Sequence, residues 1–567
     1  MLKNNDISVV IVGEAGQGVE TASDIIVKVF KMAGYNVFSC KEYMSRVRGG
    51  VNSSIIRISS GAISSYVDKI DFLVMLSPNL TGHLEKRITE ETSILYDEAF
   101  KNLSLDKYKT FAMPLSSEAA NAGGKIFLNV VAIGIIFGIF NIEMKLIEEY
   151  IRNIFSDKPE DVIQKNIQAV QSGYELGKNF INNNGLSVNV QKDELVADKI
   201  LASANEAVAL GCIAGGCDFI ASYPMSPSTA VFTYLAEKSD GFNIIVEQAE
   251  DEIAGMNMGL GAWYAGSRAM VSTSGGGFAL MIEGVSLAGM IESPMVIHLA
   301  QRPGPATGLP TRTEQGDLNL ALYSGHGEFP RIILTPGTPE DAFCLAQNAF
   351  NLADKFQVPV FILTDQYGLE SYSLCKPFDA NKTEIKDFIV KTDQNYQRYK
   401  LTDDGISPRG IPVHGDGLVK LDSDEHGEDS HITEDLDLRV KMVDKRLKKF
   451  DLIKKEIYEP ELLGNDSYKT LLIGWGSTCN GIKEALCHLN NPDIAFLYFK
   501  QIYPLSEKTL AYLEKAKNTV CFENNATGQF ANFIRQETGF TIHHKILKYN
   551  GLPFSVEELV NKIQDLI

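Results

Sequence analysis

Short apolar segments that end in a glycine- or proline-rich turn recur along this chain, and a helical pattern follows most of them. The first is Ile7–Val12, which leads through the turn Gly13–Gly18 into a helical pattern over residues 19–33. An almost continuous apolar run of this length is typical of a strand buried on both faces, as in a parallel sheet. Strand, turn and helix in this order are the repeating unit of doubly wound folds. The sequence therefore predicts the α/β fold class.

Changes of pattern divide the chain into four expected segments. Its 567 residues exceed the roughly 250–300 that one hydrophobic core holds. The polar stretch Asn182–Gly185 interrupts the first alternation of strands and helices. We expect a first α/β domain over residues 1–185, a second over 193–370, a connecting segment with an acidic stretch and a helix over 371–466, and a third α/β domain over 467–567.

The bulk composition narrows the class of protein. A formal net charge of -19 disfavours non-specific binding to nucleic acid or to an anionic membrane. The apolar run Val130–Phe140 is too short to span a bilayer. We expect strands of the first domain at Phe72–Leu76 and Lys125–Val131. No signal peptide is evident, so we expect a cytoplasmic protein without a membrane or nucleic-acid partner.

The first glycine turn is a candidate site for a phosphate group. Gly13, Gly16 and Gly18 lie between the predicted strand and helix, where backbone amides and the helix dipole favour an anion. Downstream, Arg46 and Arg48 add two cations beside a flexible turn. The spacing is not that of a dinucleotide fingerprint, and a tight turn for strand–helix packing is an equally good interpretation.

The turn Tyr223–Thr229, with the sequence YPMSPST, follows another predicted strand. Open α/β sheets bind ligands in crevices beyond the carboxyl ends of their strands. Pro224 and Pro227 fix the backbone on both sides of Ser226, so this turn presents a hydroxyl in a preset position. We assign Ser226 to ligand contact, while an ordinary turn with a serine helix cap remains the alternative.

Charged side chains lie at the ends of two later predicted strands. Glu247, Glu250, Asp251 and Glu252 lie between a predicted strand and a helix rich in small residues, and a carboxyl buried under such a helix could hold a proton for catalysis. Arg302 follows the strand at 294–300, where a guanidinium suits bidentate capture of a carboxylate. Favourable pairing with a helix dipole and a salt bridge at a domain surface are the respective structural alternatives.

Several features argue against a complete metal or redox centre in this chain. The eight cysteines include no CxxC pair, so we expect neither a zinc site nor an iron–sulfur cluster. The tripeptide Gly415-Asp416-Gly417 looks like a magnesium–diphosphate motif but lacks the strand-to-helix setting such a site needs. Leu421–Arg439 is strongly acidic, and we favour a solvated excursion over a partner-facing lid.

At YPMSPST the sequence resembles the α subunits of 2-oxoacid:ferredoxin oxidoreductases. The resemblance continues through EDEIAGMNMGLGAWYAG, STSGGGFALMIE and AQRPGPATGLPTRTEQGDL. GEAGQGVETASD near the N-terminus resembles the γ subunit of the same family, and ENNATGQ lies in a segment similar to transketolase C-terminal domains. The order γ then α resembles the two-subunit members that act on 2-oxoglutarate. The resemblance implies a Rossmann-like γ-type domain followed by a thiamine pyrimidine-binding domain.

The resemblance also implies roles for particular residues. Glu252 should hydrogen-bond the aminopyrimidine ring of thiamine diphosphate and assist deprotonation of its thiazolium carbon. Tyr223 and Pro224 lie on the same turn as Ser226 and become candidates for cofactor contact. Ser226 stands where the family has a threonine that contacts substrate.

Binding of substrate and coenzyme A is implied in the same way. Arg302 corresponds to the family's ligand for the 2-oxoacid carboxylate, and Arg312 is a candidate for a second carboxylate. The γ-type domain should hold coenzyme A, with Gly13, Gly16, Gly18 and Arg48 as candidate contacts.

The family pattern assigns the rest of the centre to other proteins. A separate β subunit should carry the diphosphate–Mg site and a [4Fe-4S] cluster, the assembly should be (αβ)2, and ferredoxin should accept the electrons. The implied reaction converts a 2-oxoacid and coenzyme A to acyl-CoA and carbon dioxide, with 2-oxoglutarate favoured. Pyruvate or branched-chain 2-oxoacids are alternatives, as are a nicotinamide dehydrogenase and a non-catalytic scaffold subunit.

Overall fold

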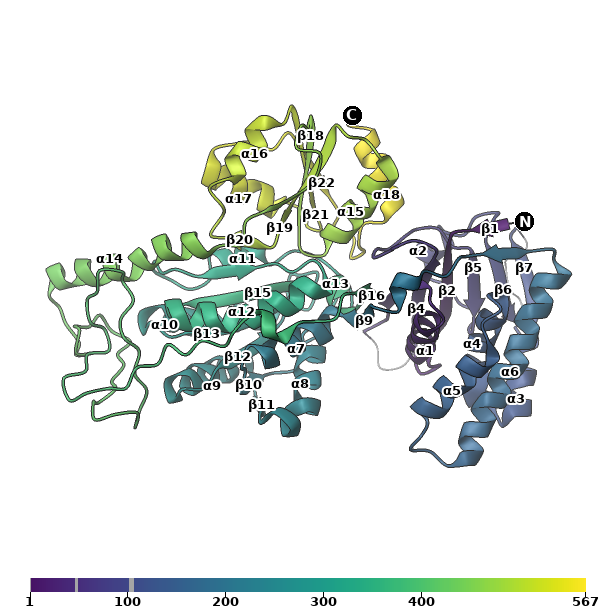
Figure 1. The fold of residues 1–567 in the computed structure, drawn as a ribbon, viewed down its shortest axis with the longest axis horizontal. Coiled ribbons are helices and arrows are strands. Elements are labelled where there is room, and N and C mark those ends of the chain that lie inside the picture. The colour runs from purple at the N-terminus through teal and green to yellow at the C-terminus, as the bar shows by residue number, and fades with distance from the viewer. Residues whose placement is uncertain (1, 46–48, 101–106) are drawn as a thin grey trace. The chain divides into compact units, whose positions relative to one another are not determined.

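The computed structural model describes residues 2–45, 49–100 and 107–567, and the chain forms two compact units. The first unit contains residues 1–202, 370–377 and 555–558, and the second contains 203–369, 378–554 and 559–567. Both are built from sheets covered by helices, which confirms the α/β fold class (Figure 1). The finer division into four segments stays a prediction.

The first unit is organised by a mixed sheet with the order β7-β6-β5-β2-β4-β3-β16-β9. Its strands are β2 (Asp6–Glu14), β3 (Asn36–Glu42), β4 (Val51–Ser59), β5 (Phe72–Met75), β6 (Ser93–Asp97), β7 (Lys109–Met113), β9 (Ile200–Ser203) and β16 (Tyr372–Cys375). Strands β2, β5, β6 and β7 run parallel, whereas β4 pairs antiparallel with both β2 and β3. The predicted strand–turn–helix beginning is present, because α1 (Val19–Met32) follows β2.

The remaining elements of this unit are mainly helical. They are α2 (Gly82–Glu85), α3 (Leu115–Ala122), η1 (Lys125–Phe127), α4 (Leu128–Ile139), α5 (Met144–Ile154), α6 (Glu160–Asn183) and η2 (Glu194–Val196), with the short parallel pair β1 (Leu2–Asn4) and β8 (Ser187–Asn189). No single described helix is apolar and long enough to cross a membrane, although α3 and residues 125–139 meet that test together as a pair bent by 119°.

The predicted strand at Lys125–Val131 is wrong, because these residues form η1 and the start of α4. Helix α4 is apolar all round and packs tightly against α6. A Cβ on Gly134 would lie 2.2 Å from the Val170 carbonyl oxygen, and one on Gly173 would lie 2.1 Å from that of Val131. A short apolar run cannot by itself distinguish a buried strand from a helix buried on every side.

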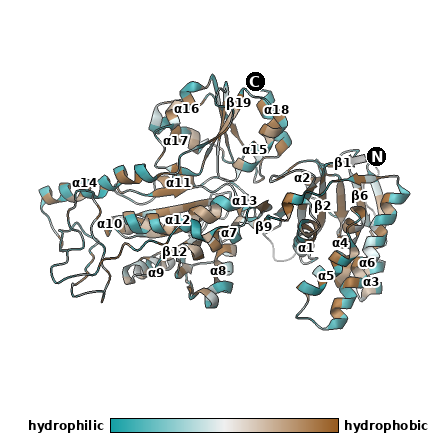
Figure 2. Cartoon of the chain, in the orientation of Figure 1, coloured by the Kyte–Doolittle hydropathy of each residue, from teal (hydrophilic) through white to brown (hydrophobic). Residues whose placement is uncertain are grey.

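The second unit contains a seven-stranded sheet with the order β11-β10-β12-β13-β15-β14-β20. Its strands are β10 (Phe219–Ser222), β11 (Ile245–Gln248), β12 (Ala269–Thr273), β13 (Met295–Gln301), β14 (Ile332–Leu334), β15 (Pro359–Asp365) and β20 (Gln501–Tyr503). All neighbours are parallel except β20, which pairs antiparallel with β14. Strands β12, β13, β14 and β15 are buried along their whole length, and Figure 2 shows the hydrophobic residues in this part of the sheet. The edge strand β11 is largely exposed.

Helices cover this sheet in two pairs, in which α7 packs with α12 and α9 packs with α10. The helices are α7 (Ala204–Ala214), α8 (Thr229–Phe242), α9 (Glu252–Ala265), α10 (Gly275–Met290), α11 (Leu318–Leu322), α12 (Pro339–Phe356) and α13 (Gln366–Glu370). Helix α7 begins with a full capping box, in which Ser203 and Glu206 each bond the backbone of the other.

A five-stranded sheet with the order β17-β19-β18-β21-β22 completes the second unit. Its strands are β17 (Glu461–Gly464), β18 (Thr470–Trp475), β19 (Ile494–Phe499), β21 (Asn518–Glu523) and β22 (His544–Leu547), and the helices near it are α15 (Thr478–Leu489), α16 (Thr509–Lys515), α17 (Gln529–Thr538) and α18 (Val556–Gln564). We call this region, residues 461–554, the C-terminal region. Because β20 leaves it to join the larger sheet, the C-terminal region and that sheet form one unit.

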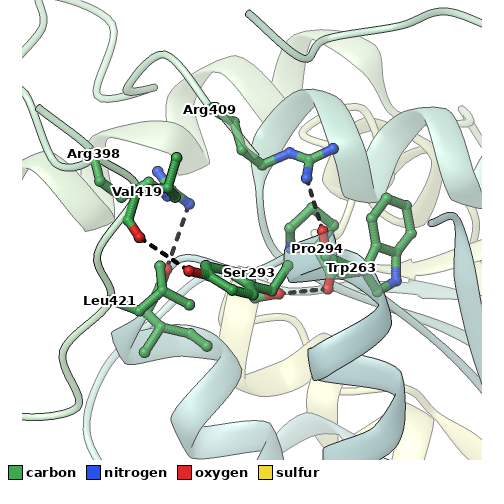
Figure 3. Close-up of a pocket in the computed structure, with 10 residues that line it drawn as sticks. Trp263, Ser293, Pro294, Arg398, Arg409, Val419 and Leu421 are labelled. Carbon is green, nitrogen blue, oxygen red and sulfur yellow. Dashed lines mark hydrogen bonds between the residues drawn. The ribbon is translucent and has the colours of Figure 1, made fainter. Parts of the chain in front are cut away.

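Residues 376–435 contain only the short η3 (Ala380–Lys382) and isolated bridges before α14 (Leu436–Ile453) and η4 (Lys454–Glu456). The irregular chain is nevertheless anchored. Arg409 donates to the Trp263 carbonyl oxygen at 3.1 Å (Figure 3). It also pairs with Asp354 at 2.6 Å. Tyr264 donates to the Val419 carbonyl oxygen at 3.0 Å.

The acidic part of this segment is held by cations and by an aromatic stack. Glu425 pairs with Arg446 at 2.9 Å, and His426 is fully buried against Tyr399 with 3.8 Å between ring centroids. Most acidic side chains of Leu421–Arg439 are exposed, as a solvated excursion requires, whereas Glu425 and His426 are held against the rest of the protein. The acidic composition of this segment alone did not predict that Arg439 and Arg446 of α14 pair with Glu425.

Candidate active site

The predicted site lies at the carboxyl ends of β10, β11, β12 and β13, which are parallel neighbours. Each of these strands ends in a turn that leads to a loop or helix, so polar side chains from distant parts of the sequence come to one edge of the sheet. Most of the residues named from the sequence in this unit follow directly from these strand ends.

Glu252 is the first residue of α9 and is 3% exposed. The preceding Asp251 caps the helix, since its side chain accepts from the Ala254 amide at 2.8 Å. Glu252 is therefore not needed as a cap, and its Oε1 is buried without a hydrogen-bond partner. A buried carboxyl oxygen left unpaired costs free energy unless a ligand completes it.

The first turn of α10 consists of three glycines, and two carboxyl groups lie against it. A Cβ on Gly277 would lie 2.3 Å from Glu252 Oε1, and a Cβ on Gly275 would lie 2.4 Å from both carboxylate oxygens of Asp317. The intervening Gly276 meets only the Ala306 carbonyl oxygen, at 3.6 Å. Gly275 and Gly277 thus permit a close approach that any other residue would block.

Arg302 contacts Ser226 through the backbone of that residue, and the predicted contact of the Ser226 hydroxyl with a ligand stays a prediction. Arg302 Nη1 donates to the Ser226 carbonyl oxygen at 2.6 Å, which joins the turn after β10 to the loop after β13. Its Nε is buried without a partner. Burial lowers the pKa of Arg302, whereas the nearby Asp317 raises it. One side of the guanidinium therefore has a donor available for an anion.

Asp317 is a residue of this site to which the sequence assigned no role. Its Oδ2 is buried and unpaired, and its side chain does not cap α11. Burial and then Glu314 raise the pKa of Asp317 to about 7, while Arg302 lowers it. Burial also raises the pKa of Glu314. The signal available in the sequence was an acidic pair on the loop that follows Arg302, within the quoted TRTEQGDL.

That loop is held in place by the C-terminal region. Gln315 is fully buried, and its side chain donates to the Trp475 carbonyl oxygen at 2.9 Å and accepts from the Asn524 amide at 3.0 Å. Asn525 donates to the Gln315 carbonyl oxygen at 3.1 Å, and Gln529 donates to that of Gly316 at 2.8 Å. The C-terminal region thereby positions Glu314 and Asp317.

Other residues predicted from the sequence lie near this edge without described contacts that fix a role. Tyr223 is 39% exposed and Pro224 is partly buried on the turn after β10. Arg312 lies on the loop held by the C-terminal region, where a Cβ on Gly551 would come within 3.1 Å of its Cβ. Their contact with cofactor or substrate stays a prediction.

The glycine turn of the first unit is closed by its own side chain. Gln17 Oε1 accepts from the Glu14 amide at 2.7 Å, and its Nε2 donates to the Leu76 carbonyl oxygen at 3.1 Å. Gly16 and Gly18 have φ values of 91° and 70°, which explains glycine at both positions. A Cβ on Gly13 would lie 2.8 Å from the same Gln17 Oε1, so the side chain of Gln17 fits only against a glycine. Arg46 and Arg48 lie outside the described residues.

The Gly415-Asp416-Gly417 tripeptide lies in the irregular segment, against Thr392. The Asp416 amide donates to the Thr392 carbonyl oxygen at 2.9 Å. Among residues 2–45, 49–100 and 107–567, no group of three or more His, Cys, Asp or Glu side chains could hold a metal ion.

Comparison with protein families defines the class of protein. Residues 210–445 match the family described as pyruvate flavodoxin/ferredoxin oxidoreductase, thiamine diphosphate-binding. Residues 8–176 match the family described as pyruvate ferredoxin/flavodoxin oxidoreductase. The second unit thus contains a thiamine-diphosphate-binding domain, and its carboxyl edge is where the unpaired Glu252 lies.

Whole-length relatives identify the family. The chain is 31% identical to the 2-oxoacid:ferredoxin oxidoreductase subunit alpha of Sulfolobus sp, over 98% of this chain and 96% of the relative. It is 27% identical to 2-oxoglutarate oxidoreductase subunit KorA of Mycobacterium tuberculosis, over 96% and 89%. The chain belongs to the 2-oxoacid:ferredoxin oxidoreductase family, as an α-type subunit. That assignment confirms the resemblance and replaces the nicotinamide-dehydrogenase alternative.

A solved structure agrees along the whole chain. The 2-oxoglutarate:ferredoxin oxidoreductase from Magnetococcus marinus, with 2-oxoglutarate, coenzyme A and succinyl-CoA bound, has a TM-score of 0.91 and 30% identity. The match covers 99% of this chain and 100% of that one.

The residues present fit the pyrimidine half of thiamine diphosphate. An aminopyrimidine ring offers a nitrogen acceptor that a protonated carboxyl can reach, and Glu252 Oε1 is buried and unpaired. The glycine at 277 keeps the approach to this carboxyl free of a side chain.

Proposed function

We propose that this α-type subunit supplies the pyrimidine-binding half of a thiamine-diphosphate centre and that a separate β subunit completes it. The observation that carries the proposal is the buried, unpaired Oε1 of Glu252 beside Gly277. Relatives named as α subunits imply further subunits. In the proposed assembly, (αβ)2, the β subunit carries the diphosphate–Mg site and the [4Fe-4S] cluster.

The proposed reaction is 2-oxoglutarate + coenzyme A + 2 oxidised ferredoxin → succinyl-CoA + carbon dioxide + 2 reduced ferredoxin + H+. The Magnetococcus marinus protein, which binds this substrate and product, supports 2-oxoglutarate over other 2-oxoacids. Bound thiamine diphosphate supplies a nucleophilic carbon and then stabilises the negative charge left as carbon dioxide departs.

Residues of this chain have the following proposed roles. Glu252 holds a proton at Oε1 and donates it in a hydrogen bond to the pyrimidine ring. Arg302 pairs with the 2-oxoacid carboxylate through the side of its guanidinium that contains the unpaired Nε. Ser226 fixes the opposite side of that guanidinium through its carbonyl oxygen. Tyr223 and Pro224 border the cofactor on the adjoining turn.

Two further roles rest on position and on the family. Arg312 is proposed to bind the distal carboxylate of 2-oxoglutarate, since it lies on the loop that follows Arg302. The turn with Gly16 and Gly18, together with Arg48, is proposed to contact coenzyme A.

Co-expression with the β subunit tests the proposal. We expect the purified complex to reduce ferredoxin with 2-oxoglutarate only when coenzyme A is present, and pyruvate to be a poorer substrate. The isolated chain should be colourless and inactive. An iron–sulfur absorbance band or turnover from the isolated chain would contradict the division of labour, and faster turnover with pyruvate would contradict the substrate assignment.

A further inference from the structure

Asp317 precedes α11, but its side chain does not cap that helix. Its carboxylate lies over Gly275 in the first turn of α10, and Oδ2 is buried without a partner. The backbone on either side is fixed, because its amide donates to Gln301 Oε1 at 3.0 Å and Gln529 holds the preceding carbonyl. A carboxyl that is rigidly placed, buried and unpaired is expected to interact with a ligand once that ligand is bound.

The charged groups that act on Asp317 are Arg302 and Glu314, which lie on the loop between β13 and α11. Glu252, at the start of α9, lies against Gly277 in the same glycine turn. Arg302 is the only one of these that carries positive charge. When a substrate carboxylate binds it, an ionised Asp317 becomes an excess negative charge in a partly buried site. Neighbouring negative charges in a partly buried site disfavour joint ionisation.

We propose that Asp317 is a positioning residue that takes up a proton when a 2-oxoacid carboxylate binds Arg302, so that substrate affinity depends on pH. The inference rests on the proposed role of Arg302 and adds to it a second carboxyl that controls how much positive charge Arg302 presents. Protonated Asp317 leaves the guanidinium to the substrate, whereas ionised Asp317 competes for it.

The direction of the pH dependence follows from the burial of this carboxyl. Burial, reinforced by Glu314, raises the pKa of Asp317 to about 7. Below pH 7 the carboxyl is neutral and affinity for the anion is highest. As pH rises through 7, Asp317 ionises and one proton must be taken up for each substrate bound. Affinity therefore falls with increasing pH.

Calorimetric binding to the αβ complex measures this coupling without turnover. The probe is 2-hydroxyglutarate, which has both carboxylates of the substrate and no carbonyl to react. From pH 6 to 8.5 we expect the dissociation constant to increase by up to about 30-fold, as linkage of one proton with a pKa of about 7 gives. Titrations at pH 8 in two buffers of different ionisation enthalpy should report uptake of about one proton.

Variants separate Asp317 from its neighbours. Asp317→Asn should show no proton uptake and less than about a threefold change over this range. Glu314→Gln should keep the uptake with its midpoint at lower pH, because Glu314 helps to raise the Asp317 pKa. If Asp317→Asn fails to assemble, Gly275→Ala displaces the same carboxyl, with Gly276→Ala as its matched control.

Proton uptake that persists in Asp317→Asn, or no uptake by the wild-type complex, would overturn the inference. Neither outcome concerns turnover, which is measured separately with 2-oxoglutarate. A complex that decarboxylates 2-oxoglutarate but binds the probe without proton uptake would retain the proposed function and exclude the role of Asp317.

Discussion

Two clusters of buried charge in the second unit differ in how their charges are paired. In the first, Glu292 is 1% exposed and lies 2.6 Å from both Lys445 and Lys449. Burial alone would raise the pKa of Glu292, but these lysines and Arg398 hold it well below its usual range. Glu292 Oε2 makes no hydrogen bond, but its ion pair with Lys449 gives it an opposite charge. In the second cluster, Glu252 and Asp317 each have a buried oxygen with neither a hydrogen bond nor an ion pair among the described residues.

The difference separates a structural cluster from a functional one. Glu292 and its lysines join α14 to the sheet domain, and each charge meets an opposite charge, as stability of a buried ion requires. The strand-end cluster has more carboxyl than cationic groups and keeps hydrogen-bonding capacity unused. Groups held in this way cost stability in the free protein and are available to a ligand.

Glu252→Gln should produce the largest change in activity. Loss of the acidic proton removes a general acid–base contribution, so we expect turnover to fall about 100–10,000-fold. The free energy of unfolding should stay the same or rise, because an unpaired buried carboxyl is lost. Steady-state assays and denaturant unfolding of the complex measure both. A marked loss of stability would place Glu252 with the structural cluster.

Glu292→Gln should instead lower the stability of the protein, because Glu292 belongs to the structural cluster. It leaves two buried lysines without their counter-charge, and breaking a buried pair from one side typically costs about 3–5 kcal/mol of unfolding free energy. Glu507→Gln is the matched control, since it removes an exposed partner 3.9 Å from Lys454, where a surface pair contributes about 0–1 kcal/mol. Equal unfolding midpoints for the two variants would remove the contrast between the clusters.

Arg302→Ala should lower kcat/KM for the 2-oxoacid about 10–100-fold, as expected from loss of a charged hydrogen bond worth about 1.5–3 kcal/mol. The KM for coenzyme A should not change, because the proposed coenzyme A contacts lie in the first unit. An unchanged kcat/KM would exclude Arg302 from substrate binding.

Two glycine-to-alanine substitutions in α10 test the functional cluster with a small change in side-chain size. Gly277→Ala puts a methyl group 2.3 Å from Glu252 Oε1, so this carboxyl must move, whereas Gly276→Ala meets nothing closer than 3.6 Å. In Gly277→Ala the same methyl group would lie 2.2 Å from Thr273 Oγ1, so that side chain must move as well. We expect at least about a tenfold lower kcat for Gly277→Ala, as misplacement of a catalytic group by about 1 Å allows. Gly276→Ala should retain wild-type kcat. Equal kcat values for the two variants would contradict the close approach of Glu252 to Gly277.

Asp317→Asn should give the smallest effect, as a change in stability whose sign depends on pH. Folding raises the pKa of Asp317 to about 7 from about 3.9 in an unfolded chain. Wild-type stability therefore falls between these values as pH rises. Full ionisation costs roughly 4 kcal/mol, and an unpaired amide cancels about 1–3 kcal/mol of the gain. Unfolding at pH 8 should favour the variant by about 1–3 kcal/mol. At pH 4 the wild-type carboxyl is protonated in the native state and only about half ionised in the unfolded state, so the cost of the amide dominates and the variant should be less stable by up to about 3 kcal/mol.

The sequence predicted what local patterns determine. Arg302 could be located because it follows an apolar strand, and parallel strands bring their carboxyl ends to one edge. The same pattern led to a group of four carboxyls, from which the family resemblance selected Glu252. Asp317 was missed because its place depends on the C-terminal region, which holds the loop through Gln315. The strand predicted at Lys125–Val131 failed because α4 is buried on all sides by tertiary packing.

The same limitation applies to the acidic segment and to the domain boundaries. Local charge suggested a solvated Leu421–Arg439, but the cations that neutralise Glu425 lie on α14. Strand β20 pairs with β14 in a sheet whose other strands lie far earlier in the chain. A local sequence pattern cannot predict that a strand pairs outside its own region.

Exchange of the C2 hydrogen of bound thiamine diphosphate tests the central claim most directly. The claim is that the unpaired carboxyl of Glu252 assists deprotonation of the cofactor held at this edge. In the αβ complex with Glu252→Gln, we predict that hydrogen–deuterium exchange, read by NMR after acid quench, slows about 100–10,000-fold while the cofactor remains bound. Exchange at the wild-type rate in this variant would contradict the account and assign the proton to another group.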